Sequence, residues 1–194
     1  PPTSSKAERV DGAFHFRMPR EILQEVEAKP VPFKKISRLQ WVGKHRLPKD
    51  PVEEGGCGCE GACGEGCVNR SIKVECVGGK GERNCSVGEG CGNRRLQQGK
   101  SAWSELELFP TPGKGYGVRC KHDLEAGQLL LEYVGEVVGD DERLRREQRA
   151  ALEGDRHDYI MMLGGGFWVD ARFKGNLGRF INHSCAPNCR VEKW

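Results

Sequence analysis

The sequence has little of what a large hydrophobic core or a membrane segment needs. Apolar residues make up 37% of the 194 residues and aromatic residues 7%. There is no run of 18 or more apolar residues, so no membrane-spanning helix is predicted. The chain begins Pro1-Pro2, without a methionine and without a charged segment leading into an apolar one. A secretory signal is therefore not visible, and we expect the natural N-terminus to lie upstream. The formal net charge of +3 is too small to indicate a partner.

Glycine and cysteine are abundant instead, with 27 and 10 residues. Seven of the cysteines fall within residues 55–91, a segment with too few apolar residues to build a core. Short gaps between them allow thiolates to converge on one tetrahedral metal ion. Seven cysteines supply the eight ligands of two zinc ions if one sulfur bridges both ions. The predicted zinc ligands are Cys57, Cys59, Cys63, Cys67, Cys76, Cys85 and Cys91.

Two other interpretations of the cysteines are less favourable. A disulfide framework is disfavoured by the odd number of cysteines in this segment and by the lack of a secretory signal. Ordinary buried thiols are disfavoured because the segment has no apolar surroundings to bury them. We therefore interpret the segment as a structural zinc centre.

The remaining pattern divides the chain into three parts. These are a basic N-terminal extension over 1–50, the zinc-binding segment over 51–103 and a strand-rich part over 104–194. A short helix is predicted over Arg20–Ala28, after Pro19. The strand-rich part predicts strands over 106–109, 116–120 and 128–138, a helix over 140–152, a hairpin of 158–163 with 167–171, and an irregular segment over 175–194. The predicted fold is mainly β with short helices.

Four motifs in the strand-rich part carry the functional signal, and each has an ordinary explanation when taken alone. They are Gly113-Lys114-Gly115-Tyr116-Gly117, Glu132-Tyr133-Val134-Gly135-Glu136, Asp158-Tyr159, and the segment from Arg179 to Cys189 that contains Asn182-His183-Ser184-Cys185. A Gly-x-Gly between strands is usually only a turn, and no helix follows it as in dinucleotide-binding motifs. A tyrosine in a strand is typical of a core. The adjacent histidine, serine and cysteine do not form a nucleophilic dyad, because neighbouring residues rarely hydrogen-bond to each other.

Taken together and in this order, the motifs resemble those of the SET-domain lysine methyltransferases. The seven-cysteine segment resembles the AWS motif that precedes SET in enzymes of the Ash1, NSD and SETD2 type. The resemblance runs from about Phe33 to Trp194 and implies a SET-type fold of small β-sheets, incomplete at the C-terminus. It implies S-adenosylmethionine as cofactor, and the implied contact residues are Lys114, Gly115, Tyr116, His157, Asp158, Tyr159, Asn182 and His183.

The resemblance also implies roles for three further residues. Tyr133 is expected to line the channel through which the substrate lysine enters. Cys63 is expected to be the sulfur that bridges the two zinc ions. Cys185 is expected to join three cysteines of a later post-SET segment around a third zinc ion.

The implied activity is transfer of methyl groups to a histone H3 lysine, most specifically lysine 36, in nuclear chromatin. The H3 tail and the nucleosome are the implied partners. The basic stretch 34–49 either contacts nucleosomal DNA through its phosphates or is a solvated linker. The catalytic-tyrosine motif and the post-SET cysteines are expected after Trp194, so residues 1–194 alone are expected not to methylate nucleosomes. The alternative is an inactive, zinc-stabilised chromatin-binding module, against which the intact Tyr133, Asn182 and His183 argue.

Overall fold

The computed structural model describes residues 8–10, 13–15, 32–44, 56–77, 84–85, 87–111, 114–155 and 157–194. The elements are β1 (Glu8–Val10), β2 (Ala13–His15), β3 (Lys34–Lys35), β4 (Gln40–Trp41), α2 (Val68–Ser71), η1 (Gly88–Gly90), η2 (Trp103–Glu105), β5 (Leu106–Thr111), β6 (Gly115–Cys120), β7 (Glu136–Gly139), α3 (Asp140–Leu152), β8 (Ile160–Gly164), β9 (Phe167–Asp170), β10 (Lys174–Gly175) and η3 (Leu177–Phe180). The prediction of a mainly β fold with short helices is confirmed. The helix predicted over Arg20–Ala28 lies outside the described residues.

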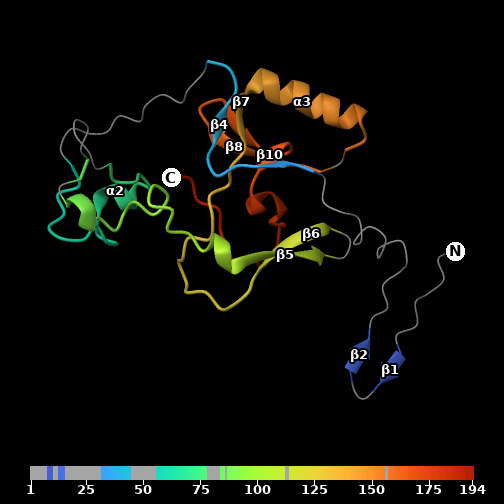
Figure 1. The fold of residues 1–194 in the computed structure, drawn as a ribbon, viewed down its shortest axis with the longest axis horizontal. Helices are drawn as coiled ribbons and strands as arrows, with labels where there is room; N and C mark the ends of the chain where they lie inside the picture. Colours follow the sequence, from blue (N-terminus) through green and yellow to red (C-terminus); the bar gives the residue numbers. More distant parts are fainter. Residues whose placement is uncertain are drawn as a thin grey trace.

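Small sheets organise the strand-rich part, as Figure 1 shows. The largest has the order β4-β7-β9-β8, in which β7 pairs antiparallel with β9 and parallel with β4. β5 and β6 form a separate antiparallel pair, and β10 pairs parallel with β3. The strands β3 and β4 precede the cysteine segment in the chain, yet they pair with strands that follow it. The cysteine segment, with α2, is consequently inserted between strands of the other part.

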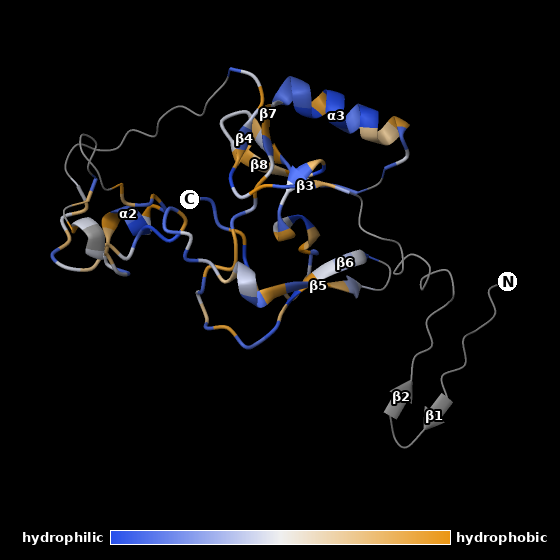
Figure 2. Ribbon diagram, viewed as in Figure 1, coloured by the Kyte–Doolittle hydropathy of each residue, from blue (hydrophilic) through white to orange (hydrophobic). Residues whose placement is uncertain are grey.

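The sheet core is small and aliphatic, with Val134, Val137, Val138, Val169 and Ala171 buried. Helix α3 covers it with a largely hydrophilic surface (Figure 2), and among its residues only Ala150 is buried. The helix has the predicted bounds, because three acidic residues fill its first turn and Gly154 follows its end with a left-handed φ of 73°.

The strand predicted over 128–138 is wrong for residues 128–135, since β7 begins only at Glu136. The preceding residues are in no strand, and no strand among the described residues pairs with them. Their backbone carbonyls are instead satisfied singly: Leu129 by the Ala102 N–H at 2.9 Å, Glu132 by the Asn176 amide at 2.7 Å, and Gly135 by the Gln40 N–H at 3.0 Å. The irregular segment predicted from Gly175 begins only after η3, at Ile181. The described residues contain no helix that is both long and apolar enough to cross a bilayer.

Candidate functional site

The cysteine segment has a core made of its own sulfur atoms. Six of the seven predicted ligands are buried, and Cys63 is fully buried. The Cys63 Sγ lies 3.6 Å from the Sγ atoms of both Cys57 and Cys85, and the Cys67 and Cys76 Sγ atoms lie 4.0 Å apart. Four sulfurs around a tetrahedral zinc ion, each about 2.3 Å from the metal, lie about 3.8 Å from one another. The sulfur positions therefore fit zinc ligation.

The sulfurs form two overlapping groups of metal-ligand geometry. One group contains Cys57, Cys63, Cys76 and Cys85, and the other contains Cys57, Cys59, Cys63 and Cys67. Cys63 belongs to both, as a bridging ligand must, and so does Cys57. The Sγ–Sγ separations of 3.6 to 4.0 Å are much longer than the roughly 2.05 Å of a disulfide bond. These pairs are therefore not disulfide-bonded, which argues against the disulfide framework considered as an alternative.

Two asparagines that sequence reasoning missed support the sulfurs. The amides of Asn69 and Asn93 both donate to the Cys76 Sγ at 3.4 Å, and the Asn93 N–H donates to the Cys91 Sγ at 3.4 Å. Burial raises the pKa of Cys63, and it raises the pKa of Cys76 to about 12. Thiols so buried ionise only when a cation compensates the charge, which is the situation of zinc ligands. The only sequence signal for Asn69 and Asn93 was their position, two residues after Cys67 and Cys91.

The first cofactor segment predicted from the sequence meets the last one. The Asn182 amide donates to the Tyr116 carbonyl at 3.0 Å, and the Lys114 ammonium donates to the His183 carbonyl at 3.4 Å. Gly115, at the start of β6, has a left-handed φ of 71°, which turns the backbone between Lys114 and Tyr116. The structure therefore brings together five of the eight predicted cofactor residues, although they are separated by more than 60 positions in the chain.

Gly117 is enclosed where these segments meet. A Cβ atom at this position would lie 2.6 Å from the Thr111 Oγ1, 3.0 Å from a Phe109 ring carbon and 3.3 Å from the Asn182 amide nitrogen. The Thr111 hydroxyl is buried without a hydrogen-bond partner among the described residues. The close approach of β5, β6 and Asn182 thus depends on the absence of a side chain at residue 117.

We predict that Gly117→Ala separates Asn182 from β6 and weakens cofactor binding. Relieving such an overlap requires backbone or side-chain shifts that cost roughly 1–3 kcal/mol in well-packed sites. Gly139→Ala is the matched control, because nothing lies within 4 Å of its Cβ position. Thermal unfolding and calorimetric titration with S-adenosylmethionine measure both effects. Equal affinities for the two variants would contradict the prediction.

The remaining predicted residues, His157, Asp158 and Tyr159, lie around Tyr133 and Arg179. The Tyr133 hydroxyl donates to the Tyr159 carbonyl at 2.7 Å, and the His157 and Tyr159 ring centroids are 6.0 Å apart. Burial raises the pKa of Tyr133, so its hydroxyl stays protonated and acts as a donor. Asp158 is exposed and accepts a hydrogen bond from the Ile160 N–H at 2.9 Å.

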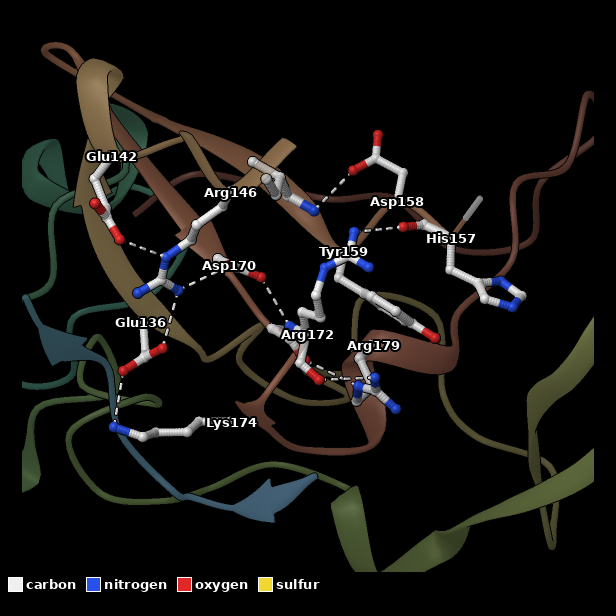
Figure 3. Close-up of polar contacts among 12 residues, drawn as sticks. Glu136, Glu142, Arg146, His157, Asp158, Tyr159, Asp170, Arg172, Lys174 and Arg179 are labelled. Carbon is white, nitrogen blue, oxygen red and sulfur yellow. Dashed lines mark hydrogen bonds and ion pairs between the residues drawn. The ribbon is translucent and has the colours of Figure 1, made fainter. Parts of the chain in front are cut away.

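Arg179, to which sequence reasoning assigned no role, lies beside Tyr159 and Arg172 (Figure 3). Its buried guanidinium donates to the carbonyls of Ala171 and Arg172 at 2.9 and 3.1 Å and lies 4.1 Å from the Tyr159 ring centroid. Burial lowers its pKa, but an arginine guanidinium stays charged at neutral pH. The next residue, Phe180, contacts the Tyr116 ring edge-on with centroids 6.4 Å apart. The two groups of predicted cofactor residues are thereby linked through Arg179-Phe180.

A buried ionic network surrounds Asp170 at the end of β9, next to Ala171 and Arg172, which contact Arg179. The Asp170 side chain is fully buried, and it accepts hydrogen bonds from Arg146 of α3 and the Arg172 N–H, both at 2.8 Å. Arg146 also pairs with Glu136 at 2.9 Å, and Lys174 reaches the same carboxylate at 2.8 Å (Figure 3). Burial alone would raise the pKa of Glu136, but its hydrogen bonds from Lys174 and Arg146 lower it. The network joins α3, β7, β9 and β10.

Cys185 lies apart from the sulfur cluster. It is exposed, and its Sγ is 3.7 Å from the His183 Nε2. Neither metal-ligand group found among the described residues includes it. Its expected zinc site with later cysteines stays a prediction.

Comparison with known protein families identifies both parts of the chain. The SET domain family model matches residues 115–194, and the AWS domain family model matches residues 55–99. The chain thus belongs to the SET-domain proteins in which an AWS domain precedes SET. The resemblance predicted from the motifs is confirmed, and so is the SET-type β fold with a cysteine-rich segment before it.

The relatives are histone-lysine methyltransferases by name. The histone-lysine N-methyltransferase ASHH2 of Arabidopsis thaliana is 41% identical over 168 residues, covering 84% of this chain and 9% of the relative. The histone-lysine N-methyltransferase, H3 lysine-36 specific, of Chaetomium globosum is 44% identical over 150 residues, covering 76% of this chain and 16% of the relative. The protein of the same name in Aspergillus fumigatus is 46% identical over 135 residues, covering 69% of this chain and 13% of the relative. The chain thus spans between 9% and 16% of the length of these relatives.

Proposed function

We propose that the chain forms the cofactor-binding part of a protein-lysine N-methyltransferase that modifies histone H3, at lysine 36, in the nucleus. The observation that carries the proposal is the junction of Lys114–Tyr116 with Asn182 and His183, together with the half-buried Tyr133. The names of the relatives support the choice of histone and of site. The H3 tail and the nucleosome are accordingly the proposed partners. Contact of the basic stretch 34–49 with nucleosomal DNA is part of the proposal, with residues 45–49 outside the described part.

S-adenosylmethionine, when bound, supplies an electrophilic methyl group. In the proposal Lys114, Gly115, Tyr116, Asn182 and His183 would hold it, together with His157–Tyr159. A lysine amine has a pKa of about 10.4, so making it neutral at pH 7 costs roughly 4–5 kcal/mol. Because Tyr133 stays protonated, it donates a hydrogen bond instead of accepting the lysine proton. The burial that raises the pKa of Tyr133 also disfavours the ammonium form of a lysine beside it, and fixed positions keep the nucleophile aligned.

Activity tests the proposal directly. In the longest form that its transcript encodes, the protein is incubated with tritium-labelled S-adenosylmethionine and recombinant nucleosomes. Label is expected on histone H3 and is expected to be lost when lysine 36 of H3 is replaced by arginine. Binding of S-adenosylmethionine to residues 1–194, measured by calorimetry, tests the cofactor site by itself. If the protein shows neither cofactor binding nor methyl transfer, the alternative of an inactive chromatin-binding module is favoured.

Tyr133→Phe is expected to spare cofactor binding and to reduce turnover or change the number of methyl groups added. The hydroxyl donates to the Tyr159 carbonyl at 2.7 Å, and the same carbonyl accepts from the Ala171 N–H at 3.0 Å. Loss of the hydroxyl therefore removes one of two hydrogen bonds, worth roughly 0.5–1.5 kcal/mol, and leaves the channel wall less well fixed. Single-turnover kinetics with mass spectrometry of the H3 tail measures the effect. Unchanged product distribution and rate would contradict a role in the channel.

For the AWS segment we propose two zinc ions, with Cys63 as the bridging ligand. Elemental analysis of the purified protein is expected to give two zinc ions per chain, and less than one would contradict the proposal. Cys63→Ser is expected to lower stability more than Cys91→Ser, because two metal sites lose a ligand instead of one. Cys91 is the matched control, since it is also buried and is predicted to bind one ion only.

A further inference from the structure

The segment that carries Asn182 and His183 has little structure of its own. Residues 181–191 contain no helix or strand, and all of them are exposed. The near end is tied to the β6 side of the site through the contacts of Asn182 with Tyr116 and of His183 with Lys114. Because such a segment buries almost no surface, its position depends on how its two ends are held.

The far end of this segment is held by the AWS domain. The Glu192 carboxylate lies 3.5 Å from the Lys73 ammonium, just beyond α2. The Arg95 guanidinium lies 5.3 Å from the centroid of the Trp194 ring, within the range of a cation–π contact. The Trp194 indole N–H donates to Glu192 at 3.1 Å, which joins the two contacts. Figure 1 shows the C-terminal end beside the part of the molecule that carries α2.

The backbone at Lys73 ends α2. Its φ is 58°, the single left-handed non-glycine conformation among the residues that the structure describes. The Lys73 N–H donates to the Arg70 carbonyl at 3.0 Å and the Val74 N–H donates to the Asn69 carbonyl at 2.8 Å, as at many helix C-termini. Glycine adopts this conformation without strain, so it is a suitable replacement for Lys73.

We propose that Lys73 and Arg95 are positioning residues for the cofactor site. Through Glu192 and Trp194 they hold the far end of the segment whose near end presents Asn182 and His183. The AWS domain then contributes to methyl transfer by fixing a cofactor-binding segment of the SET domain. The inference rests on the proposed function, in which Asn182 and His183 bind S-adenosylmethionine.

The test is the double variant Lys73→Gly/Arg95→Met in the protein in its longest natural form. Glycine suits the left-handed φ, so folding and zinc content are expected to be retained. Methionine keeps much of the length and apolar surface of Arg95. Arg190→Gln is the matched control: Arg190 is exposed and also pairs with Glu192, at 2.7 Å, but belongs to the segment itself. Lys73→Arg, which keeps the charge, is expected to behave like the unaltered protein.

Two independent measurements are made on each protein. An exposed ion pair and a cation–π contact are each worth a factor of roughly two to five, so the double variant is expected to raise the Kd and KM for S-adenosylmethionine about fivefold to tenfold. Its kcat at saturating cofactor is expected to change less than about twofold, because the bound geometry is regained once the cofactor holds the segment. Fluorine NMR of protein labelled with 5-fluorotryptophan is expected to show the Trp194 resonance moving towards its solvent-exposed position.

Three results would overturn the inference, and they are distinguishable. An unchanged Trp194 resonance in the double variant would mean that Lys73 and Arg95 do not hold the segment. A shifted resonance with unchanged cofactor affinity would mean that the segment is held but that its position does not matter. If the unaltered protein binds no S-adenosylmethionine, the proposed function fails and the positioning role with it, while the Trp194 resonance still reports whether the anchor exists.

Discussion

Replacing Arg146 with alanine is expected to destabilise the protein by about 3–5 kcal/mol, the usual consequence of leaving one member of a buried ion pair without its partner. Arg146 is the cation that compensates Asp170, whose side chain has 0% exposure. Without it, the Asp170 carboxylate keeps the Arg172 N–H as a hydrogen-bond donor, but no other cation among the described residues pairs with it. Because typical domains are stable by only about 5–15 kcal/mol, much of the population is expected to unfold on mild heating.

Arg145→Ala is the matched control for this experiment. Arg145 is the neighbouring residue on α3 and pairs with Glu142 at 2.7 Å, but its side chain is 69% exposed. Exposed pairs contribute roughly 0–1 kcal/mol, so this variant is expected to unfold close to the unaltered protein. Chemical denaturation with two spectroscopic probes measures the free energy of unfolding of both variants. Adding Asp170→Asn to Arg146→Ala should recover part of the loss, because the buried charge is removed. Similar losses of stability for both arginine variants would show that burial does not determine how much these ion pairs contribute.

Asn182→Ala is expected to lower the affinity for S-adenosylmethionine at least about 100-fold. In the proposed site the amide binds the cofactor, and it also ties its segment to the Tyr116 carbonyl at 3.0 Å. Two lost hydrogen bonds, each worth roughly 0.5–1.5 kcal/mol, together with a displaced segment account for a change of this size. Calorimetric titration measures it, and zinc content is expected to stay unchanged because the sulfur cluster lies in a separate part of the chain.

Asn188→Ala controls for general effects on the same segment. Asn188 is exposed and lies six positions further along. Its replacement is expected to leave cofactor affinity within about twofold, since surface substitutions usually have small effects. A normal titration curve for Asn182→Ala would remove Asn182 from the cofactor site and leave only its structural contact with Tyr116.

Local pattern was sufficient for several features of this protein. The bounds of α3 follow from its acidic first turn and from the glycine past its end. The β8–β9 hairpin follows from three consecutive glycines, each of which has a left-handed φ. Six of the seven cysteines chosen from their spacing belong to the groups of metal-ligand geometry, because short gaps limit how far apart the sulfurs can lie. The motifs from Lys114 to His183 were sufficient to predict the family, which the domain matches confirm.

Local sequence patterns could not predict which distant residues contact each other. Residues 128–135 have the composition of a strand, but whether an extended segment joins a sheet depends on which neighbour reaches it. Asp170 and Arg146 are 24 positions apart, and nothing in either local sequence specifies the ion pair. The same holds for Arg179 and Tyr159, and for Lys73 and Glu192.

The sequence by itself thus determined the elements whose causes are local: the helix ends, the glycine turns, the cysteine spacing and the family motifs. Only the tertiary structure decided that Asn182 lies against Tyr116, that Arg179 is stacked on Tyr159, and that the end of the chain contacts the AWS domain. The physical reason is the range of the interactions. Backbone preferences and ligand spacing act over a few residues, whereas burial and charge compensation depend on which distant segments the fold brings together.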